Sequence, residues 1–300
     1  MTRGSAVALI ITCVVLCGVV AMVVVAVGAS VGFLPGLELY GLENIGAPRV
    51  GLVTLVGEIF VAQPTVEALQ KMEKRDDVCA ILLRVDSPGG GVVASQEIHD
   101  EVMRIRENGE KPVVVSMGSV AASGGYYVAC ASNAIVANPG TACGSIGVLT
   151  SYLNAKDLCE KIGISFETLT TGDFKGMGEL DEEMTPEQRE VIQAVLDDIH
   201  DQFVAAVSEG RNLPYDRVAE IADGRIFTGR QALDLGLVDE VGNLRDAVML
   251  AGELAGVERE PVLIDDAVPT FGFFDEMKGL ARQVAAKLAD SNPKFELVYR

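Results

Sequence analysis

The 300-residue sequence lacks tryptophan, has only two histidines, and carries 24 basic residues against 43 acidic ones. The formal net charge of −19 at pH 7 repels phosphate groups, which argues against nucleic acid as a partner. The six cysteines show none of the close pairing that is typical of a zinc site. We therefore expect no metal, no cofactor and no structural disulfide.

Charge is also missing from the amino-terminal region. No charged residue occurs between positions 4 and 37, and most of this stretch is apolar. As a helix it can cross the ~30 Å hydrocarbon layer, and it exceeds the ~7–15 residues usual in the core of a cleavable signal. We expect an uncleaved span at about residues 6–29, with cleavage as the alternative. Arg3 precedes the span and Glu38 and Glu43 follow it, which predicts a single-pass protein of the cell membrane with a cytoplasmic amino terminus and the remainder outside.

Composition divides the chain into four parts. We expect a membrane anchor in residues 1–37, a linker in 38–48, a folded domain in 49–265 and a tail with an amphipathic helix in 266–300. In the folded domain, apolar runs of strand length alternate with helical patterns. This alternation predicts an α/β fold of repeated βαβ units around a mainly parallel sheet.

Two turns that follow predicted strands carry groups suited to acyl transfer. In Asp86-Ser-Pro-Gly-Gly-Gly91, consecutive glycines let backbone N–H groups face a cleft, as a phosphate cradle or an oxyanion hole requires. This turn lacks the Lys-Ser/Thr ending of a P-loop. Ser123 lies at a strand-to-helix turn, where its hydroxyl is exposed and the helix amino terminus favours negative charge. A simple helix N-cap is the alternative reading of Ser123.

A serine nucleophile needs a base. His99 and His200 both lie inside predicted helices, flanked by acids, and both look structural. Lys175 differs from the other lysines because it lies in the glycine-flanked stretch Thr170-Thr-Gly-Asp-Phe-Lys-Gly-Met-Gly178. A free lysine has a pKa near ~10.4, and burial lowers such a pKa by up to ~3–5 units. If Lys175 is buried in a cleft, it can act as the general base.

These segments, together with Gly144-Ser-Ile-Gly-Val148 and the stretch from Gly224 to Asp239, occur in the order typical of the signal peptide peptidase A family. The chain resembles the short, single-copy form of that family from about Arg49 to Ile264. The resemblance implies a ClpP/crotonase-like serine peptidase fold, a Ser–Lys dyad on Ser123 and Lys175, and homo-oligomeric rings. It also implies an oxyanion hole from the N–H groups of Gly90 and Gly124, and a Ser145 hydroxyl that orients Lys175.

The same resemblance implies a substrate class. Members of the family degrade remnant signal peptides and other extended apolar peptides at the membrane. By analogy with the fold, such a peptide would add as a strand beside Gly91, Val92 and Val93 and beside Gly147 and Val148.

Three alternatives stay open at this stage. A Ser–Lys membrane protease of the stomatin-operon-partner type shares the serine-glycine features, although its span arrangement generally differs. A crotonase-like acyl-CoA enzyme uses the same oxyanion geometry, but it would leave Lys175 unexplained. An inactive scaffold that binds peptides is the third.

Overall fold

The computed structural model describes residues 47–265, and the predicted membrane span and carboxy-terminal tail lie outside this range. Within it, no helix combines the length and hydrophobicity that a membrane span requires.

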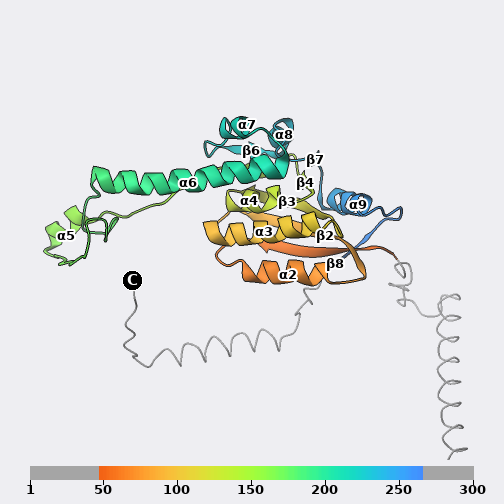
Figure 1. The fold of residues 1–300 in the computed structure, drawn as a ribbon, viewed down its shortest axis with the longest axis horizontal. Coiled ribbons are helices and arrows are strands. Elements are labelled where there is room, and N and C mark those ends of the chain that lie inside the picture. The colour runs from red at the N-terminus through yellow and green to blue at the C-terminus, as the bar shows by residue number, and fades with distance from the viewer. Residues whose placement is uncertain (1–46, 266–300) are drawn as a thin grey trace, which may run out of the picture. The chain divides into compact units, whose positions relative to one another are not determined.

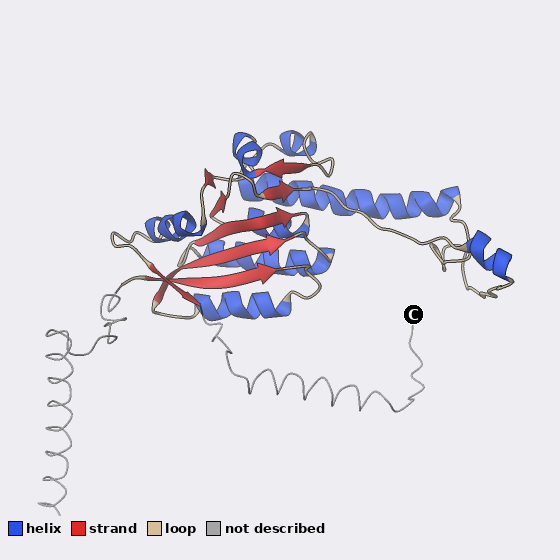
Figure 2. Ribbon diagram, turned by 180° about the vertical axis from the view of Figure 1, so that it is seen from behind, coloured by secondary structure: helices blue, strands red, loops and turns tan. Residues whose placement is uncertain are grey.

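Within the described residues, eight strands form one sheet in which β6, β5, β3, β2, β1 and β8 are neighbours in that order, and β4 and β7 continue from β3 (Figure 2). All pairs are parallel except β5 with β6. The strands are β1 (Arg49–Val56), β2 (Val78–Ser87), β3 (Val113–Ala122), β4 (Ala134–Ala137), β5 (Ala142–Gly144), β6 (Ile226–Thr228), β7 (Glu240–Val241) and β8 (Val262–Asp265). The predicted α/β architecture with a mainly parallel sheet is confirmed.

Helices cover both faces of this sheet (Figure 1). They are α2 (Gln63–Glu73), α3 (Val92–Asn108), α4 (Gly124–Cys130), α5 (Lys156–Ile162), α6 (Pro186–Arg211), α7 (Tyr215–Ala219), α8 (Gly229–Asp234) and α9 (Leu244–Leu254). Because successive side chains of a strand point to opposite faces, β2 divides its residues between two cores. Ile81 and Leu83 pack in the larger core with α2, α3, α4 and α6, whereas Leu82 packs in a smaller core with α9. Burial on both faces explains why the sequence of β2 reads as a continuous apolar run.

Helix α6 extends beyond the core. In the sequence, Thr185 followed three residues later by Gln188 is a capping-box pattern that predicts a helix start, and the structure forms it: Gln188 N donates to Thr185 Oγ1 at 3.2 Å and Thr185 N donates to Gln188 Oε1 at 3.0 Å. The apolar stripe of the helix is buried only in the carboxy-terminal half, where Phe203 lies, whereas Val195 nearer the start is 55% exposed. The first half therefore projects away from the sheet (Figure 1).

Residues 149–185, called the arm below, connect the sheet to the start of α6 and contain α5 (Figure 1). Its two sides are joined by Ala155 N, which donates to Leu180 O at 2.7 Å, and by Tyr152, which packs against Gly178. Cys159 is the one buried residue of the arm. The stretch Ser165–Leu169, which looks strand-like in sequence, forms no strand and is exposed. The arm therefore has almost no core of its own.

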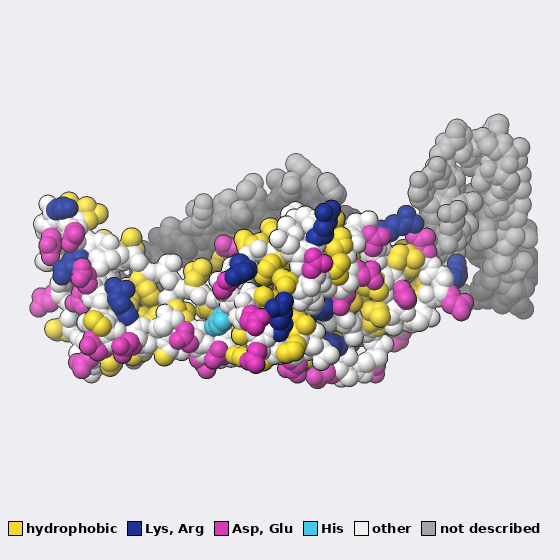
Figure 3. Space-filling model, turned by 90° about the horizontal axis from the view of Figure 1, so that it is seen from above, with side chains coloured by type: hydrophobic (Ala, Val, Ile, Leu, Met, Phe, Trp, Pro, Cys, Tyr) yellow, Lys and Arg dark blue, Asp and Glu magenta, His cyan; other side chains and the backbone are white. Residues whose placement is uncertain are grey.

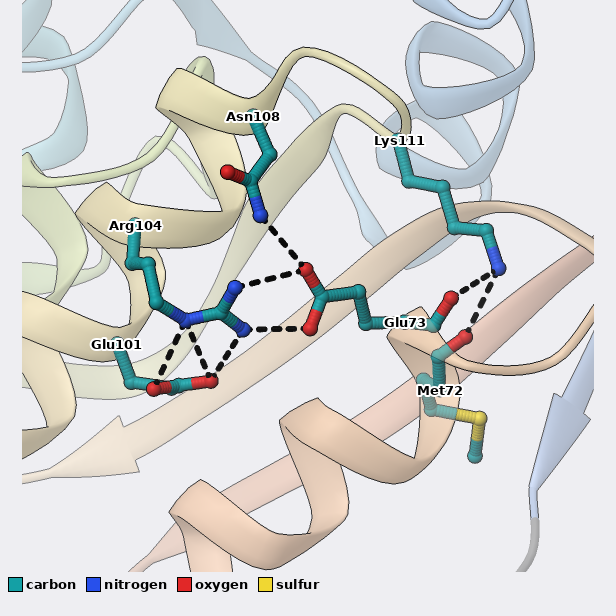
Figure 4. A network of polar contacts seen from close by, with 6 residues as sticks. All are labelled: Met72, Glu73, Glu101, Arg104, Asn108 and Lys111. Atoms are coloured by element: carbon teal, nitrogen blue, oxygen red, sulfur yellow. Dashed lines mark hydrogen bonds and ion pairs between the residues drawn. The ribbon is translucent and has the colours of Figure 1, made fainter.

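A polar network joins the carboxy-terminal end of α2 to the carboxy-terminal part of α3 (Figure 4). Arg104 on α3 bonds Glu73 of α2 and Glu101 of its own helix, and Asn108 also donates to Glu73. Lys111 donates to the backbone carbonyl of Met72, where the negative end of the α2 dipole favours a cation. The network fixes the helix that begins directly after the glycine turn.

Candidate active site

The glycine turn after β2 is held by the segment that follows β1. Ile59 N donates to Gly89 O at 2.9 Å, and Gly91 N donates to Ile59 O at 2.7 Å, which makes a parallel bridge between Ile59 and Gly90. A Cβ on Gly90 would lie 2.4 Å from Ile59 O, so only glycine fits there. Because successive N–H groups of an extended chain point to opposite sides, the N–H of Gly90 points away from Ile59.

Ser123 sits in a strained turn between β3 and α4. Its φ of 51° and ψ of −124° lie outside the regions that non-glycine residues favour, at a cost of about 1–3 kcal/mol. The turn is maintained by a hydrogen bond from Ser123 N to Gly144 O at 2.8 Å. Although Ser123 occupies the N-cap position of α4, its side chain makes no capping hydrogen bond. The N-cap alternative therefore does not explain this serine.

The glycine turn and the serine turn meet. A Cβ on Gly89 would lie 2.6 Å from Gly124 N and 2.8 Å from Ser123 Cβ, and a Cβ on Gly124 would lie 3.3 Å from Gly90 N. Within the described residues, no protein acceptor bonds the N–H of Gly90 or of Gly124. Two unpaired N–H groups beside a serine hydroxyl are what an oxyanion hole requires.

A cleft of about 760 Å³ opens over these turns. Its lining includes Ser123, Ser145, Gly90 and Gly124, with Val92, Tyr127 and Phe203 among its apolar parts. Gly147 and Val148 also line it, in a segment that forms no strand.

The expected peptide-binding strand at Gly91–Val93 needs correction. Val92 and Val93 form the first turn of α3, and Gly91 N is already bonded to Ile59. A substrate strand cannot pair along this segment as expected, because Gly91 is the last extended residue before the helix. Val92 contributes its side chain to the cleft instead.

Ser145 also has a positive φ, of 51°. A positive φ is strained for serine, whereas glycine, as at the preceding Gly144, adopts it without strain. The backbone of Ser145 is held by the two residues just before β6, since Ser145 N donates to Arg225 O at 2.9 Å and Gly224 N donates to Ile146 O at 3.0 Å. A serine kept where glycine would be less strained suggests that its hydroxyl has a function. The Gly224–Asp239 segment therefore supports the cleft through Ser145.

Lys175 does not join this cleft within one chain. It is exposed in a turn of the arm, where its N–H donates to Gly172 O at 3.1 Å, and it is absent from the cleft lining. About 27 Å of helix, at 1.5 Å per residue, separates the start of α6 at Thr185 from Phe203 in the cleft wall. The structure thus brings together Ser123, Gly90, Gly124 and Ser145, but not the predicted base.

The histidines offer no obvious substitute. His200 lines the cleft, which its place inside a helix did not predict. Its Nε2 donates to Ala222 O at 2.7 Å, which leaves Nδ1 as the ring nitrogen that can accept a proton, and no hydrogen bond within residues 47–265 joins that nitrogen to Ser123. His99 is buried with its ring 4.9 Å from that of Tyr127, and its Nδ1 lies 3.1 Å from Asp100 Oδ1. It does not line the cleft.

Cysteine chemistry is not favoured either. Burial raises the pKa of Cys130 to about 12 and that of Cys143 to about 11, so neither forms a reactive thiolate near neutral pH. Among residues 47–265, no cluster of histidine, cysteine and acidic side chains could hold a metal ion. The serine is the nucleophile that the site presents.

Comparison with known proteins agrees with this geometry. The model of the Peptidase family S49 matches residues 105–258, and that of the Clp protease family matches residues 50–141. A Synechocystis protein named as a putative protease is 45% identical over 219 residues, covering 72% of this chain and 78% of that protein. The chloroplastic serine protease SPPA of Arabidopsis thaliana is 33% identical over 237 residues, covering 78% of this chain but only 35% of that protein. Protease 4 of Haemophilus influenzae is 32% identical over 244 residues, with 78% of this chain and 39% of that protein covered. The chain therefore belongs to peptidase family S49 and is a serine peptidase with a ClpP-like fold.

Proposed function

We propose that the protein is a membrane-anchored endopeptidase with a Ser–Lys dyad, in which Ser123 is the nucleophile and Lys175 the general base. The observation that carries this proposal is the strained turn at Ser123, whose hydroxyl lies uncapped beside the unpaired N–H groups of Gly90 and Gly124. The family membership fixes the reaction class, and the dyad gives it a mechanism.

The reaction proceeds in two stages. Ser123 Oγ attacks the peptide carbonyl while the neutral amine of Lys175 takes the hydroxyl proton, and the oxyanion accepts hydrogen bonds from Gly90 and Gly124. Lys175 then gives the proton to the leaving amine, which releases the first product. Water, activated by the same amine, hydrolyses the acyl-enzyme and frees Ser123.

Lys175 is best supplied by a second copy of the chain. In one chain the lysine is exposed on the arm, and no lysine is among the described residues that line the cleft. The arm also exposes many large apolar side chains (Figure 3). Exposed apolar patches of this kind often mark surfaces that a partner covers. The exposed side chains of the arm are Leu149, Tyr152, Leu153, Leu158, Ile162, Ile164, Phe166, Leu169, Phe174 and Leu180. A homo-oligomer in which each arm packs on the next copy would bury these residues and desolvate the amine, which favours its neutral form.

Ser145 fits a role beside the incoming amine. It lines the cleft with a half-buried side chain, and its strained backbone is bonded to Arg225, just before β6. Its hydroxyl can donate a hydrogen bond to a neutral amine and so hold it toward Ser123. This role requires Lys175 to enter the cleft on the Ser145 side.

The substrates we propose are extended apolar peptides, including remnant signal peptides. Apolar side chains of Val92, Tyr127, Val148 and Phe203 contribute to the cleft. Acidic side chains are spread over the face in Figure 3, whereas basic ones are sparse, so acidic peptides should be poor substrates. A relative from Enterococcus faecium, 38% identical over 211 residues, is named as a putative signal peptide peptidase. The chain covers 59% of that protein.

Mixing two inactive variants tests the shared dyad. Full-length Ser123→Ala and Lys175→Ala chains, co-expressed in equal amounts, should regain about a quarter of wild-type activity, because random assembly pairs an intact serine with an intact lysine at about one site in four. Ser123→Ala mixed with the Ser123→Ala/Lys175→Ala double variant is the matched control and should stay inactive. Inactivity of the first mixture, with mixed oligomers demonstrated by differential tags, would show that the two residues do not act across copies.

We also propose that residues 49–265 lie outside the cytoplasm behind a single span. The proposal rests on the uncharged stretch between positions 4 and 37 and on Arg3 as the charge before it. Cells are treated so that their outer envelope is permeable to protease while the cytoplasmic membrane stays intact. Added protease should then digest the domain, and a cytoplasmic marker protein should stay intact. Protection of the domain under these conditions would overturn this topology but not the dyad.

A further inference from the structure

Strand β3 contains an irregularity just before the catalytic turn. Val85 of β2 pairs with Met117 of β3, but two residues later Ser87 pairs with Ala121. Between these two pairs β3 advances by four residues while β2 advances by two. The additional residues of β3, at Gly118–Val120, form a bulge in the ladder. Such bulges redirect a strand, and this one precedes Ser123 by only a few residues.

The side chain of Asp86 occupies the bulge. Its Oδ1 accepts a hydrogen bond from Val120 N at 3.0 Å. A Cβ on Gly118 would lie 2.5 Å from the carboxyl carbon of Asp86, so Gly118 leaves the space that the carboxylate fills. On the other side, Thr141 Oγ1 donates to Gly118 O at 2.7 Å. Each end of the bulge thus has one dedicated polar partner.

Asp86 is not used in an ion pair. No cation within residues 47–265 pairs with its carboxylate, and the neighbouring Arg84 donates instead to Ser116 Oγ and Met117 O, just before the bulge. The half-buried carboxylate of Asp86 has one backbone N–H as its described side-chain partner, and that N–H belongs to the bulge, which points to a geometric role.

The bulge changes the partner of β3. Before it, Val114 to Ser116 pair with β4, and after it, Val120 to Ala122 pair with β5. The second pairing leads directly into the bond from Ser123 N to Gly144 O. The position of Ser123 and Gly124 relative to the glycine turn therefore depends on how the bulge is held.

We propose that Asp86 is a positioning residue for the peptidase reaction, an inference that rests on the proposed role of Ser123 and the oxyanion hole. Asp86 begins the segment that carries Gly90, and through Val120 it also fixes the strand that leads to Gly124. One short segment thus sets both donors of the oxyanion hole. Asp86 acts through the backbone and does not touch the substrate.

Two substitutions separate the hydrogen bond from other effects of the side chain. Asp86→Asn keeps an acceptor oxygen of the same size, whereas Asp86→Ala removes it. We expect Asp86→Ala to lower kcat about 10- to 100-fold with little change in KM, and Asp86→Asn to stay within about threefold of wild type. Rates are expressed per folded, assembled chain. Thermal unfolding measures the folded fraction, and sedimentation measures the assembled fraction. Thr141→Val, which removes the other bond of the bulge, should lower kcat in the same direction and serves if Asp86→Ala does not fold.

The rate at which a fluorophosphonate labels Ser123 provides the deciding measurement, because it needs the nucleophile and the oxyanion hole but no peptide. Labelling of Asp86→Ala should slow in parallel with kcat. If the wild type is labelled at Ser123 and folded Asp86→Ala and Thr141→Val react equally fast, Asp86 has no positioning role. Loss of labelling in Asp86→Asn equal to that in Asp86→Ala would also overturn it. A wild type that is not labelled at Ser123 would instead refute the proposed function.

Discussion

The core around Ser123 and the arm around Lys175 are built in opposite ways. Ser123 follows the buried residues Ala121 and Ala122 of β3, and its backbone is fixed by hydrogen bonds to Gly144, Tyr126 and Tyr127. The arm buries only Cys159 and leaves residues such as Leu169 91% exposed. A single chain therefore supplies enough contacts to define the nucleophile and the oxyanion donors, but not enough to define the place of the base. The difference teaches that the fold alone defines the serine and the oxyanion donors, whereas the proposed base would reach them only through assembly.

The largest expected effect is on the base itself. Lys175→Arg should lower kcat/KM by about 10³-fold or more, as much as Lys175→Ala, since a guanidinium with a pKa above ~12 cannot give up its proton. Lys161→Arg, on α5 of the same exposed arm, is the matched control and should keep wild-type activity. Initial rates on an apolar peptide decide the matter, and more than about a tenth of wild-type activity in Lys175→Arg would remove Lys175 from the mechanism.

Next in size is the loss of arm contacts. Leu169→Asp should dissociate the oligomer and reduce activity about tenfold or more, because burial of a leucine stabilises an interface by about 1.5–3 kcal/mol. Leu254→Asp on α9, where the leucine is 47% exposed on the core, should change neither property. Sedimentation velocity at several concentrations gives the oligomeric state. An oligomer that survives Leu169→Asp with full activity would place the arm outside the interface.

Replacing Ser145 by glycine offers a sharper test, because loss of the backbone strain should raise stability while loss of the hydroxyl should lower activity. Ser145→Gly should raise the unfolding free energy by about 0.5–1 kcal/mol, since glycine tolerates the φ of 51°, while lowering kcat/KM about tenfold and moving its rising limb to higher pH. Asn212→Gly, with the same φ at the end of α6, should gain similar stability without loss of activity. Thermal unfolding and a pH–rate profile measure both effects. An unchanged pH–rate profile in folded Ser145→Gly would mean that Ser145 serves only as a turn residue.

The smallest effect concerns the polar network that fixes α2 to α3. The hydrogen bond from Arg104 lowers the pKa of Glu73 below that of a free glutamate, ~4.3. The stability that this shift contributes is fully present above that value and is lost as pH falls through the lower pKa of the folded state. Glu73→Gln should thus cost about 1 kcal/mol at pH 7 and progressively less in acid, with kcat unchanged. A destabilisation that did not vary with pH would mean that packing, not charge, is responsible.

Local signals account for what the sequence predicted correctly. Apolar runs predicted the strands because β2 and β3 are buried on both faces, and the capping box at Thr185 and Gln188 predicted the start of α6. The glycine turn after β2 and the turn at Ser123 were each recognised from local sequence, whereas the family resemblance implied that Gly90 and Gly124 would lie together beside Ser123.

Signals that depend on distant contacts were missed. The glycines around Lys175 suggested a cleft, but the arm has no core to form one. Val92 and Val93 favour strands by propensity, yet Gly91 ends the extended segment and α3 begins. The bulge at Gly118–Val120 has no local signature beyond one glycine, because its cause is a carboxylate on the neighbouring strand.

The exposed position of Lys175 has a consequence for how such an enzyme is kept harmless while it is being made. If the lysine is shared between copies as proposed, a newly synthesised chain carries a nucleophile without its activator and cannot digest its neighbours. Inhibition by a propeptide is then not needed, because the chains become active only when they assemble. Specific activity should fall on dilution with a steep concentration dependence, and recover when the protein is concentrated again.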